Sequence, residues 1–151
     1  MEAKRRILII NGVNLQELGT REVNIYGTLC FDDYFKALQQ RHPEVELHYF
    51  QSNHVGELAE AITRHKDFDG IILNPGAYTH TTLVLADAIK AVAVPVVEVH
   101  ITNLFGREQY RRKSFITGVC KGQICGFGLH GYEMALTALK QFISSDAACR
   151  V

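Results

Sequence analysis

The sequence has no excess of charge of either sign and no long hydrophobic run. Its 151 residues include 16 Lys and Arg and 16 Asp and Glu, which gives a formal net charge of zero at neutral pH. Proteins that bind duplex DNA usually carry a basic excess that neutralises phosphates. The longest apolar runs are about five residues, against the roughly 20 that a membrane-spanning helix needs. We therefore expect neither a nucleic-acid partner nor a membrane partner.

Signals for secretion and for metal binding are missing as well. Asn11 and Asn14 interrupt the short apolar run after the charged N-terminal residues, unlike the run of a secretory signal, so we expect a cytoplasmic protein. The four cysteines contain no C-x-x-C pair, which argues against a zinc ribbon and a thioredoxin-like site. No histidine cluster has the spacing of metal ligands. We expect reduced structural cysteines and no metal.

Short apolar runs alternate with amphipathic stretches along the whole chain. The runs at 7–10, 70–73 and 95–97 are continuously apolar, which is typical of parallel strands covered on both faces. Weaker strand candidates lie at 45–50 and 122–127. Apolar residues with helical spacing occupy four further segments, 31–38, 55–62, 85–92 and 132–143. This pattern predicts an α/β, flavodoxin-like three-layer fold with a five-stranded parallel sheet in the order 2-1-3-4-5.

One domain accounts for this whole pattern. A chain of this length buries roughly 68–70% of its unfolded surface, enough for one core, so we expect a single domain over residues 1–151. In such a sheet, ligands bind outside the carboxyl ends of the strands. The segments that follow the predicted strands are rich in polar groups, and we expect the functional site among them.

The loop after the first predicted strand, at about residues 12–28, is longer than the roughly two to six residues of an ordinary strand-to-helix connection. It carries Asn14, Arg21 and Tyr26, with glycines that could serve as hinges. We favour a lid that closes over a substrate. A solvated surface loop is the alternative.

Two acid–base candidates stand at the end of the fourth predicted strand. Glu98 and His100 are two residues apart, so their side chains project to the same face. A carboxylate beside an imidazole orients the ring and favours its protonated form, which suits a general acid. The alternative is a hydrogen-bonded structural pair.

Basic residues follow this strand. If the stretch 107–111 is helical, Arg107 and Arg111 share one face. Two guanidiniums at this edge suit an anionic, hydroxylated ligand, because the planar fork of arginine matches a carboxylate. The alternative is an exposed turn in which the two arginines form salt bridges with Glu108.

Polar residues also follow the third predicted strand. Asn74 and His80 are candidates for hydrogen bonds to ligand hydroxyls. We expect Thr79 or Thr81 to cap the next helix, whose N-terminus would offer N–H groups to an anion.

The stretch 126–131 fits G-x-G-x-x-G, but a dinucleotide site also needs an acidic residue on a second strand about 20 positions further on. The sequence has Ala147, Ala148 and Cys149 there. We expect these glycines to allow close backbone packing or subunit contact rather than to bind a nucleotide.

Six segments, taken together and in order, resemble the type II 3-dehydroquinate dehydratases over nearly the whole chain, from about Ile7 to Phe142. These segments are NGVNLQELGTREVNIYG, QSNHVGEL, LNPGAYTHT, VEVHITN, REQYRRKS and GFGLHGYEMAL. The resemblance implies anti elimination of water from 3-dehydroquinate, through an enolate and without a cofactor, to give 3-dehydroshikimate. This reaction is a step of the shikimate pathway toward chorismate and aromatic amino acids. The resemblance also implies a homododecamer, a tetramer of trimers.

The same resemblance implies a role for each matching position. Tyr26 would be the base that takes the proton next to the ketone, and Arg21 would lower the pKa of Tyr26. His100, oriented by Glu98, would protonate the departing hydroxyl, and Asn14 would hold the water that stabilises the enolate oxygen. The positions implied to bind substrate are Asn74, His80, Asp87, Ile101, Thr102 and Arg111. Of these, Asp87 matches a position that reaches a neighbouring subunit's site, and Arg107 matches a position near the site.

The sequence departs from the family pattern at a few positions. Val13 and Val23 stand where proline is common, which implies a looser lid. Thr102 replaces a common serine but keeps the hydroxyl, and Phe105 and Gly106 replace a common His-Ala or Tyr-Ala pair. These departures bear on rate and affinity, because every proposed catalytic group is present.

Other functions remain open on the residues alone. A flavin-binding or receiver-type module shares the predicted fold, but the sequence shows no acidic phosphoacceptor cluster. A catalytically inactive structural homologue is a further alternative, although all the expected catalytic residues are there. The type I route to the same product uses a lysine imine, and none of the seven lysines is at a position implied above to be catalytic or to bind substrate.

Overall fold

Five strands form one parallel sheet in the order β2-β1-β3-β4-β5, as the sequence predicts. The computed structural model describes residues 2–20, 24 and 29–149. The strands are β1 (Arg5–Asn11), β2 (Val45–Gln51), β3 (Gly70–Asn74), β4 (Val96–His100) and β5 (Gly122–Cys125). The chain crosses from one side of β1 to the other between β2 and β3, and this reversal of strand order marks the place where ligands bind in sheets of this kind.

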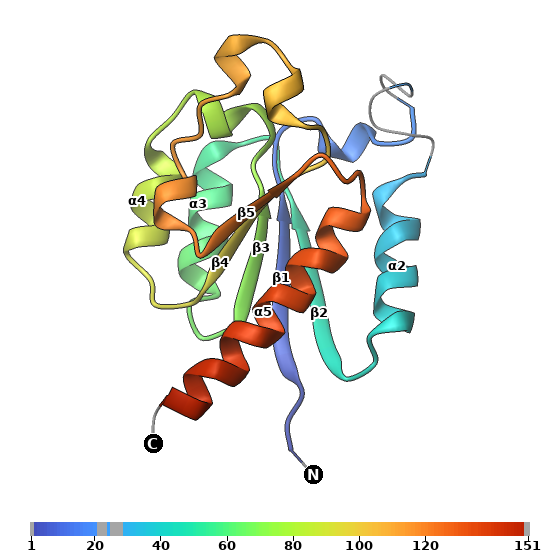
Figure 1. Cartoon of the computed structure of the whole chain (residues 1–151), viewed down its shortest axis with the longest axis vertical. Helices are drawn as coiled ribbons and strands as arrows, with labels where there is room; N and C mark the ends of the chain where they lie inside the picture. Colours follow the sequence, from blue (N-terminus) through green and yellow to red (C-terminus); the bar gives the residue numbers. More distant parts are fainter. Residues whose placement is uncertain (1, 21–23, 25–28, 150–151) are drawn as a thin grey trace.

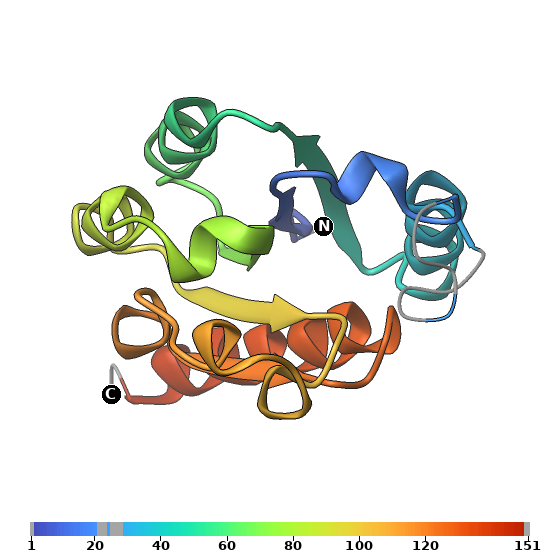
Figure 2. The same cartoon turned by 90° about the horizontal axis from the view of Figure 1, so that it is seen from above.

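Helices cover both faces of the sheet and complete the predicted three layers (Figures 1 and 2). The α-helices are α2 (Phe31–Arg41), α3 (Val55–Arg64), α4 (Val84–Lys90) and α5 (His130–Cys149). The short 3-10 helices are η1 (Leu15–Glu17), η2 (Gly76–His80), η3 (Leu104–Gly106), η4 (Gln109–Arg111) and η5 (Thr117–Val119). Helices α2 and α5 pack on one face, and α3 and α4 pack on the other. Among the described residues, no helix is both long and apolar enough to cross a membrane.

The continuous apolar run of β1 reflects these two covered faces. Ile7 and Ile9 point into the core formed with α2 and α5, whereas Leu8 and Ile10 point into the core formed with α3 and α4. All four side chains are buried. Because each fully buried aliphatic side chain contributes about 1.5–3 kcal/mol, this short strand ties both layers of helices to the sheet.

The ends of β1 and β3 approach each other at Gly12. The Gly12 N–H donates to the carbonyl oxygen of Asn74 at 2.7 Å. A Cβ atom at Gly12 would lie 2.2 Å from the carbonyl oxygen of Pro75, so no other residue fits there without a backbone shift. This close approach brings the loop after β1 and the loop after β3 to the same point on the sheet edge.

The condition that residues 107–111 form one helix is not met. Arg107 is extended, with φ −100° and ψ −176°, and it separates η3 from η4. The side chain of Asn103 caps η3 by accepting from the N–H of Phe105 at 3.2 Å, which starts a separate short turn before the arginines. The spacing argument that placed Arg107 and Arg111 on one helix face therefore does not apply.

The predicted cap of the helix after β3 is wrong. Gly76, with φ +65°, begins η2, so α4 does not start until Val84. Neither Thr79 nor Thr81 caps α4, whereas the Thr82 hydroxyl oxygen accepts from the N–H of Val84 at 3.1 Å. With seven residues, α4 is too short to provide the anion site that the sequence suggested.

The glycines after β5 allow close packing, as expected. Gly126 has φ +96°, and a Cβ there would lie 3.1 Å from the Cβ of Asn103. A Cβ at Gly131 would lie 3.3 Å from the side chain of Val99. These glycines let the start of α5 and the end of β5 lie against β4 and its following turn.

Candidate active site

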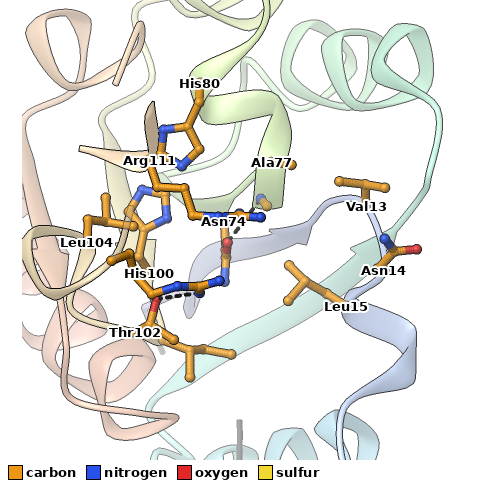
Figure 3. A pocket seen from close by; sticks show the side chains of 13 residues that line it. Val13, Asn14, Leu15, Asn74, Ala77, His80, His100, Thr102, Leu104 and Arg111 are labelled. Carbon is orange, nitrogen blue, oxygen red and sulfur yellow. Dashed lines mark hydrogen bonds between the residues drawn. The ribbon is translucent and has the colours of Figure 1, made fainter. Parts of the chain in front are cut away.

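A cavity of about 120 Å³ opens at the carboxyl edge of the sheet, between the loop after β1, η2 and the segment after β4 (Figure 3). Its lining residues are Val13, Asn14, Leu15, Asn74, Gly76, Ala77, His80, His100, Ile101, Thr102, Leu104, Arg107 and Arg111. A bound water needs roughly 10–15 Å³ by the same measure, so the cavity has room for a small metabolite of about ten water-sized groups. It lies beside the reversal of strand order, where the fold predicts a ligand.

Glu98 and His100 form a buried pair at the end of β4. Their side chains point to the same face, as strand alternation predicts, and Nε2 of His100 lies 2.5 Å from Oε2 of Glu98. Glu98 is 0% exposed and His100 is 4% exposed. The other ring nitrogen of His100, Nδ1, has no partner among the described residues and is the one available to the cavity that His100 lines.

Glu98 is held as a carboxylate. Burial alone would raise the pKa of Glu98, but the hydrogen bond and charge interaction with His100, followed by the hydrogen bonds from Thr117 and Ser114, outweigh burial and lower it. The Ser114 hydroxyl donates at 2.9 Å, the Thr117 hydroxyl at 2.5 Å, and the side-chain amide of Gln123 at 3.2 Å. The sequence pattern does not predict these three donors. Two of them, Ser114 and Thr117, lie in an irregular segment between β4 and β5 that has no strand or α-helix pattern.

His80 lies beside His100, and the two rings are stacked with centroids 6.2 Å apart. Nδ1 of His80 lies 2.6 Å from the carbonyl oxygen of Lys113, so Nδ1 carries the proton and donates it. Burial lowers the pKa of His80, although the bond to Lys113 opposes this effect. A neutral His80 with its proton on Nδ1 presents Nε2 as an acceptor, which suits a ligand hydroxyl.

Asn74 is fixed by a buried network between β1, β3 and α5. Its side-chain amide donates to the hydroxyl of Tyr132 at 2.9 Å, and Tyr132 donates to the side-chain oxygen of Asn11 at 2.7 Å. The side-chain oxygen of Asn74 accepts from the N–H of Gly76 at 3.2 Å. Both ends of the amide are therefore oriented before any ligand arrives, and one N–H of Asn74 remains for the cavity.

The two arginines reach the cavity without sharing a helix. The guanidinium of Arg107 donates to the hydroxyl of Thr102 at 3.3 Å. Glu108 pairs with both arginines, with its Oε2 3.5 Å from Nε of Arg107 and 3.1 Å from Nε of Arg111. The alternative of a salt-bridged turn is therefore partly right, yet both side chains line the cavity. Among the residues that the structure describes, two arginines and one glutamate meet at this wall, an excess of one positive charge.

The structure brings most of the predicted site residues together. Besides those above, Asn14 lines the cavity opposite His100, and buried Ile101 lines it beside Thr102. Asp87 is exposed on α4 and does not line the cavity of its own chain. Arg21 and Tyr26 lie outside the described residues.

The first part of the predicted lid is anchored to the core. Leu15 and Leu18 are buried against the face covered by α2 and α5. Asn14 has φ 63°, and its N–H donates to the side chain of Asn53 at 2.9 Å. Of the rest of the predicted lid, residues 21–23 and 25–28 lie outside the described residues.

Comparisons with known proteins agree with this geometry. Residues 5–140 match the family model described as dehydroquinase class II. A 3-dehydroquinate dehydratase of Caldicellulosiruptor bescii is 48% identical over 143 residues, which cover 92% of this chain and 99% of that protein. One from Exiguobacterium is 50% identical over 135 residues, covering 89% of this chain and 93% of that protein.

Solved structures give the same result. The type II dehydroquinase of Butyrivibrio crossotus matches with a TM-score of 0.89 at 40% identity, covering 92% of this chain and 99% of that chain. The type II dehydroquinase of Propionibacterium acnes matches with a TM-score of 0.85 at 33% identity, covering 95% and 99%. The chain belongs to the class II dehydroquinase family.

Proposed function

We propose that this protein is a hydro-lyase that removes water from 3-dehydroquinate to give 3-dehydroshikimate, a step of the shikimate pathway toward chorismate. The main support for the proposal is the buried Glu98–His100 pair. Nε2 of His100 contacts Glu98, and the ring lines a small cavity that Arg107 and Arg111 also line. In such a pair, His100 can protonate a leaving hydroxyl of a substrate, and the same site can bind the carboxylate of that substrate.

The proposed reaction begins with removal of a proton from the carbon next to the ketone by Tyr26, whose phenolate form Arg21 favours. The electrons of the broken C–H bond form an enolate, and a water held by Asn14 stabilises the enolate oxygen. Collapse of the enolate expels the hydroxyl, and His100 gives this group the proton that makes it water. Glu98 keeps the imidazolium oriented and balances its charge.

Substrate binding uses the remaining lining residues. The backbone N–H groups at Ile101 and Thr102 and the Thr102 hydroxyl supply donors for the carboxylate, and Arg111 supplies donors for a ring hydroxyl. Asn74 and His80 bind ring hydroxyls, with Asn74 offering an N–H and His80 an acceptor nitrogen. The preorganised Asn74 and the carbonyl-bound His80 support these roles, because neither side chain has to be ordered when the substrate binds.

We also propose that residues 1–151 act as a single catalytic domain within a homododecamer, a tetramer of trimers, in the cytoplasm. Helix α4 supports an interface, because Leu83 and Val84 before and at its start are 61% and 44% exposed. The exposed Asp87 lies one turn further along the same helix and would complete the site of a neighbouring subunit.

The test is the ultraviolet absorbance of metal-free protein after addition of 3-dehydroquinate. The product is a conjugated enone that absorbs where the substrate does not, so we expect a rising signal. A flat signal from folded, oligomeric protein would contradict the proposal and favour a binding module or an inactive homologue.

A second measurement separates this mechanism from the lysine-imine route. None of the side chains that line the cavity is a lysine. We therefore expect that borohydride added with substrate leaves the mass of the protein unchanged. A trapped covalent adduct would contradict the enolate mechanism.

A further inference from the structure

The three neutral donors around Glu98, namely Ser114, Thr117 and Gln123, have no role in the mechanism given above. Ser114 precedes η5, Thr117 begins η5, and Gln123 lies on β5. None of these three residues is among those that line the described cavity. We call these three residues the Glu98 clamp.

The hydrogen bonds of the clamp fix the direction of each proton. The Ser114 hydroxyl oxygen accepts from the N–H groups of Ile116 and Thr117, each at 3.2 Å. Its single proton is therefore left for Oε2 of Glu98 at 2.9 Å. The Thr117 hydroxyl oxygen accepts from the amide of Gln123 at 3.0 Å and gives its own proton to Oε1 of Glu98.

Glu98 is consequently surrounded by donors alone. A carboxylate has about four acceptor positions, and the three clamp residues and His100 supply four donors. A proton on Oε2 would find no acceptor on Ser114, whose lone pairs are used. Because these donors favour the ionised form, Glu98 accepts from His100, and a proton lies on Nε2 of the ring. The proton available for chemistry is then the one on Nδ1.

We propose that the Glu98 clamp keeps Glu98 permanently ionised and thereby directs the transferable proton of His100 to Nδ1, at the cavity. Ser114, Thr117 and Gln123 are positioning residues that act through Glu98 on His100. This inference rests on the proposed function, in which His100 protonates the leaving hydroxyl.

The charges around Glu98 show why neutral donors suit this task. The titratable groups that act on it among the described residues are His100 on β4, His80 on η2 and the Cys120 thiol before β5. The pKa of Cys120 is raised to about 12 by burial and by Glu98, so Cys120 stays neutral. A second cation would compete with the imidazolium for the carboxylate. Hydroxyl and amide donors stabilise the Glu98 carboxylate without cancelling its negative charge. That charge can therefore still attract a protonated His100.

The experiment compares variants of the full-length enzyme. Thr117→Val keeps the shape of the side chain and removes its hydroxyl, so Glu98 becomes easier to protonate. We expect kcat to fall roughly tenfold, KM to change less than about twofold, and the acidic limb of the kcat–pH profile to move up by about one unit. Thr117→Ser restores the hydroxyl and should restore both kcat and the acidic limb.

The matched control is Thr63→Val on α3. Thr63 is exposed, and its hydroxyl donates to the carbonyl oxygen of Glu60 at 3.1 Å. This variant should leave kcat and the pH profile unchanged. Gln123→Met provides an independent removal of a donor if Thr117→Val does not fold, with the same direction of change expected.

Three outcomes would count against the clamp. Unchanged kcat and an unchanged acidic limb in folded Thr117→Val would overturn it, as would the same result in Gln123→Met. A Thr117→Ser variant as impaired as Thr117→Val would show that the hydroxyl is not the cause. Absence of turnover in the unsubstituted protein would instead overturn the proposed function, and the clamp with it.

Discussion

At the residue scale, the central feature is a carboxylate that water does not reach. Glu98 is fully buried, and an isolated charge there would be strongly unfavourable. Its hydrogen bonds offset the loss of water and lower its pKa below the ordinary value of 4.5. The hydrogen bonds that offset the cost of burying Glu98 also keep it ionised, so that it can pair with a protonated His100.

The pH dependence of stability follows from this shift. Because the folded state binds fewer protons at Glu98 than the unfolded state near pH 4.5, the stabilisation is complete above 4.5 and is lost as the pH falls through the lower pKa of the folded state. We expect urea unfolding at fixed protein concentration to give a free energy that falls below about pH 4.5 as Glu98 binds its proton, in addition to the loss below about pH 6.5 that the lowered pKa of His80 causes. Glu98→Gln should be less stable at pH 7 by about 1–3 kcal/mol and should show a shallower fall. A fall as steep as that of the unsubstituted protein would contradict a role for Glu98.

Tyr26 acts as the base in the proposed mechanism. Tyr26→Phe should lower kcat by about 10²–10⁴-fold while substrate still binds, because only the proton acceptor is removed. Turnover assays and titration calorimetry with 3-dehydroquinate measure the two effects. Tyr78→Phe is the control, since its hydroxyl donates to the exposed carbonyl of Asn53 at 2.7 Å, where water can replace it. Full activity in Tyr26→Phe would remove Tyr26 as the base.

Tyr132 orients a substrate-binding amide from inside the core. Tyr132→Phe removes the hydroxyl that joins Asn11 to Asn74 and leaves two buried groups unpaired. We expect a loss of about 1–3 kcal/mol of stability and a several-fold rise in KM with a smaller change in kcat. Thermal unfolding and steady-state kinetics test both, again against Tyr78→Phe. A lowered melting temperature with an unchanged KM would mean that the network supports the fold alone.

At the scale of elements, the site depends on how closely two loops pass each other. The loop after β1 brings Asn14, and the end of β3 brings Asn74, to opposite sides of the cavity (Figure 3). Gly12 sets their separation, because only a residue without Cβ allows its backbone to approach Pro75.

Gly12→Ala should therefore harm both stability and binding. Its Cβ would lie 2.2 Å from a backbone oxygen, so the two loops must move apart, and we expect a loss of about 1–3 kcal/mol together with a higher KM. Gly56→Ala is the matched control, because nothing lies within 4 Å of its Cβ position on α3. This control should gain about 0.5–1 kcal/mol from helix propensity. Melting temperatures and KM values separate the two, and equal behaviour would contradict the role of Gly12.

Elements also show where the sequence pattern succeeds and where it fails. The continuous apolar runs predict the central strands β1, β3 and β4, because burial on both faces requires such a run. The edge strands β2 and β5 are only partly buried and show weaker patterns, and the amphipathic stretches predict the four α-helices. The structure of the segment after β4 could not be predicted in this way, because its 3-10 turns at Leu104–Gly106 and Gln109–Arg111 have no apolar periodicity. Their geometry depends on side-chain caps such as that of Asn103.

At the scale of the whole molecule, one of the residues predicted to bind substrate, Asp87, does not line the described cavity of its own chain. Asp87 is exposed on α4, near the exposed Leu83 and Val84. An exposed apolar patch next to an acidic side chain is a reasonable contact surface for another subunit.

Gel filtration and kinetics test this assembly. We expect the protein to elute with about twelve times the 17.0 kDa mass of one chain. Asp87→Ala should keep this size and raise KM by roughly tenfold, because a charged hydrogen bond to substrate in the neighbouring site is lost. Asp67→Ala, which removes an exposed carboxylate paired with Arg6, should leave KM unchanged. Elution as a monomer would contradict the assembly, and an unchanged KM in Asp87→Ala would contradict its role.

The sequence by itself determined the layered α/β fold and the shared face of Glu98 and His100. These features follow from periodicity and from the two-residue alternation of a strand, which are local properties of the chain. Only the tertiary structure decided that Ser114, Thr117 and Gln123 surround Glu98 and that Tyr132 orients Asn74. Those contacts join residues 16 to 58 positions apart, and their geometry depends on how the packed elements meet, which no local pattern records.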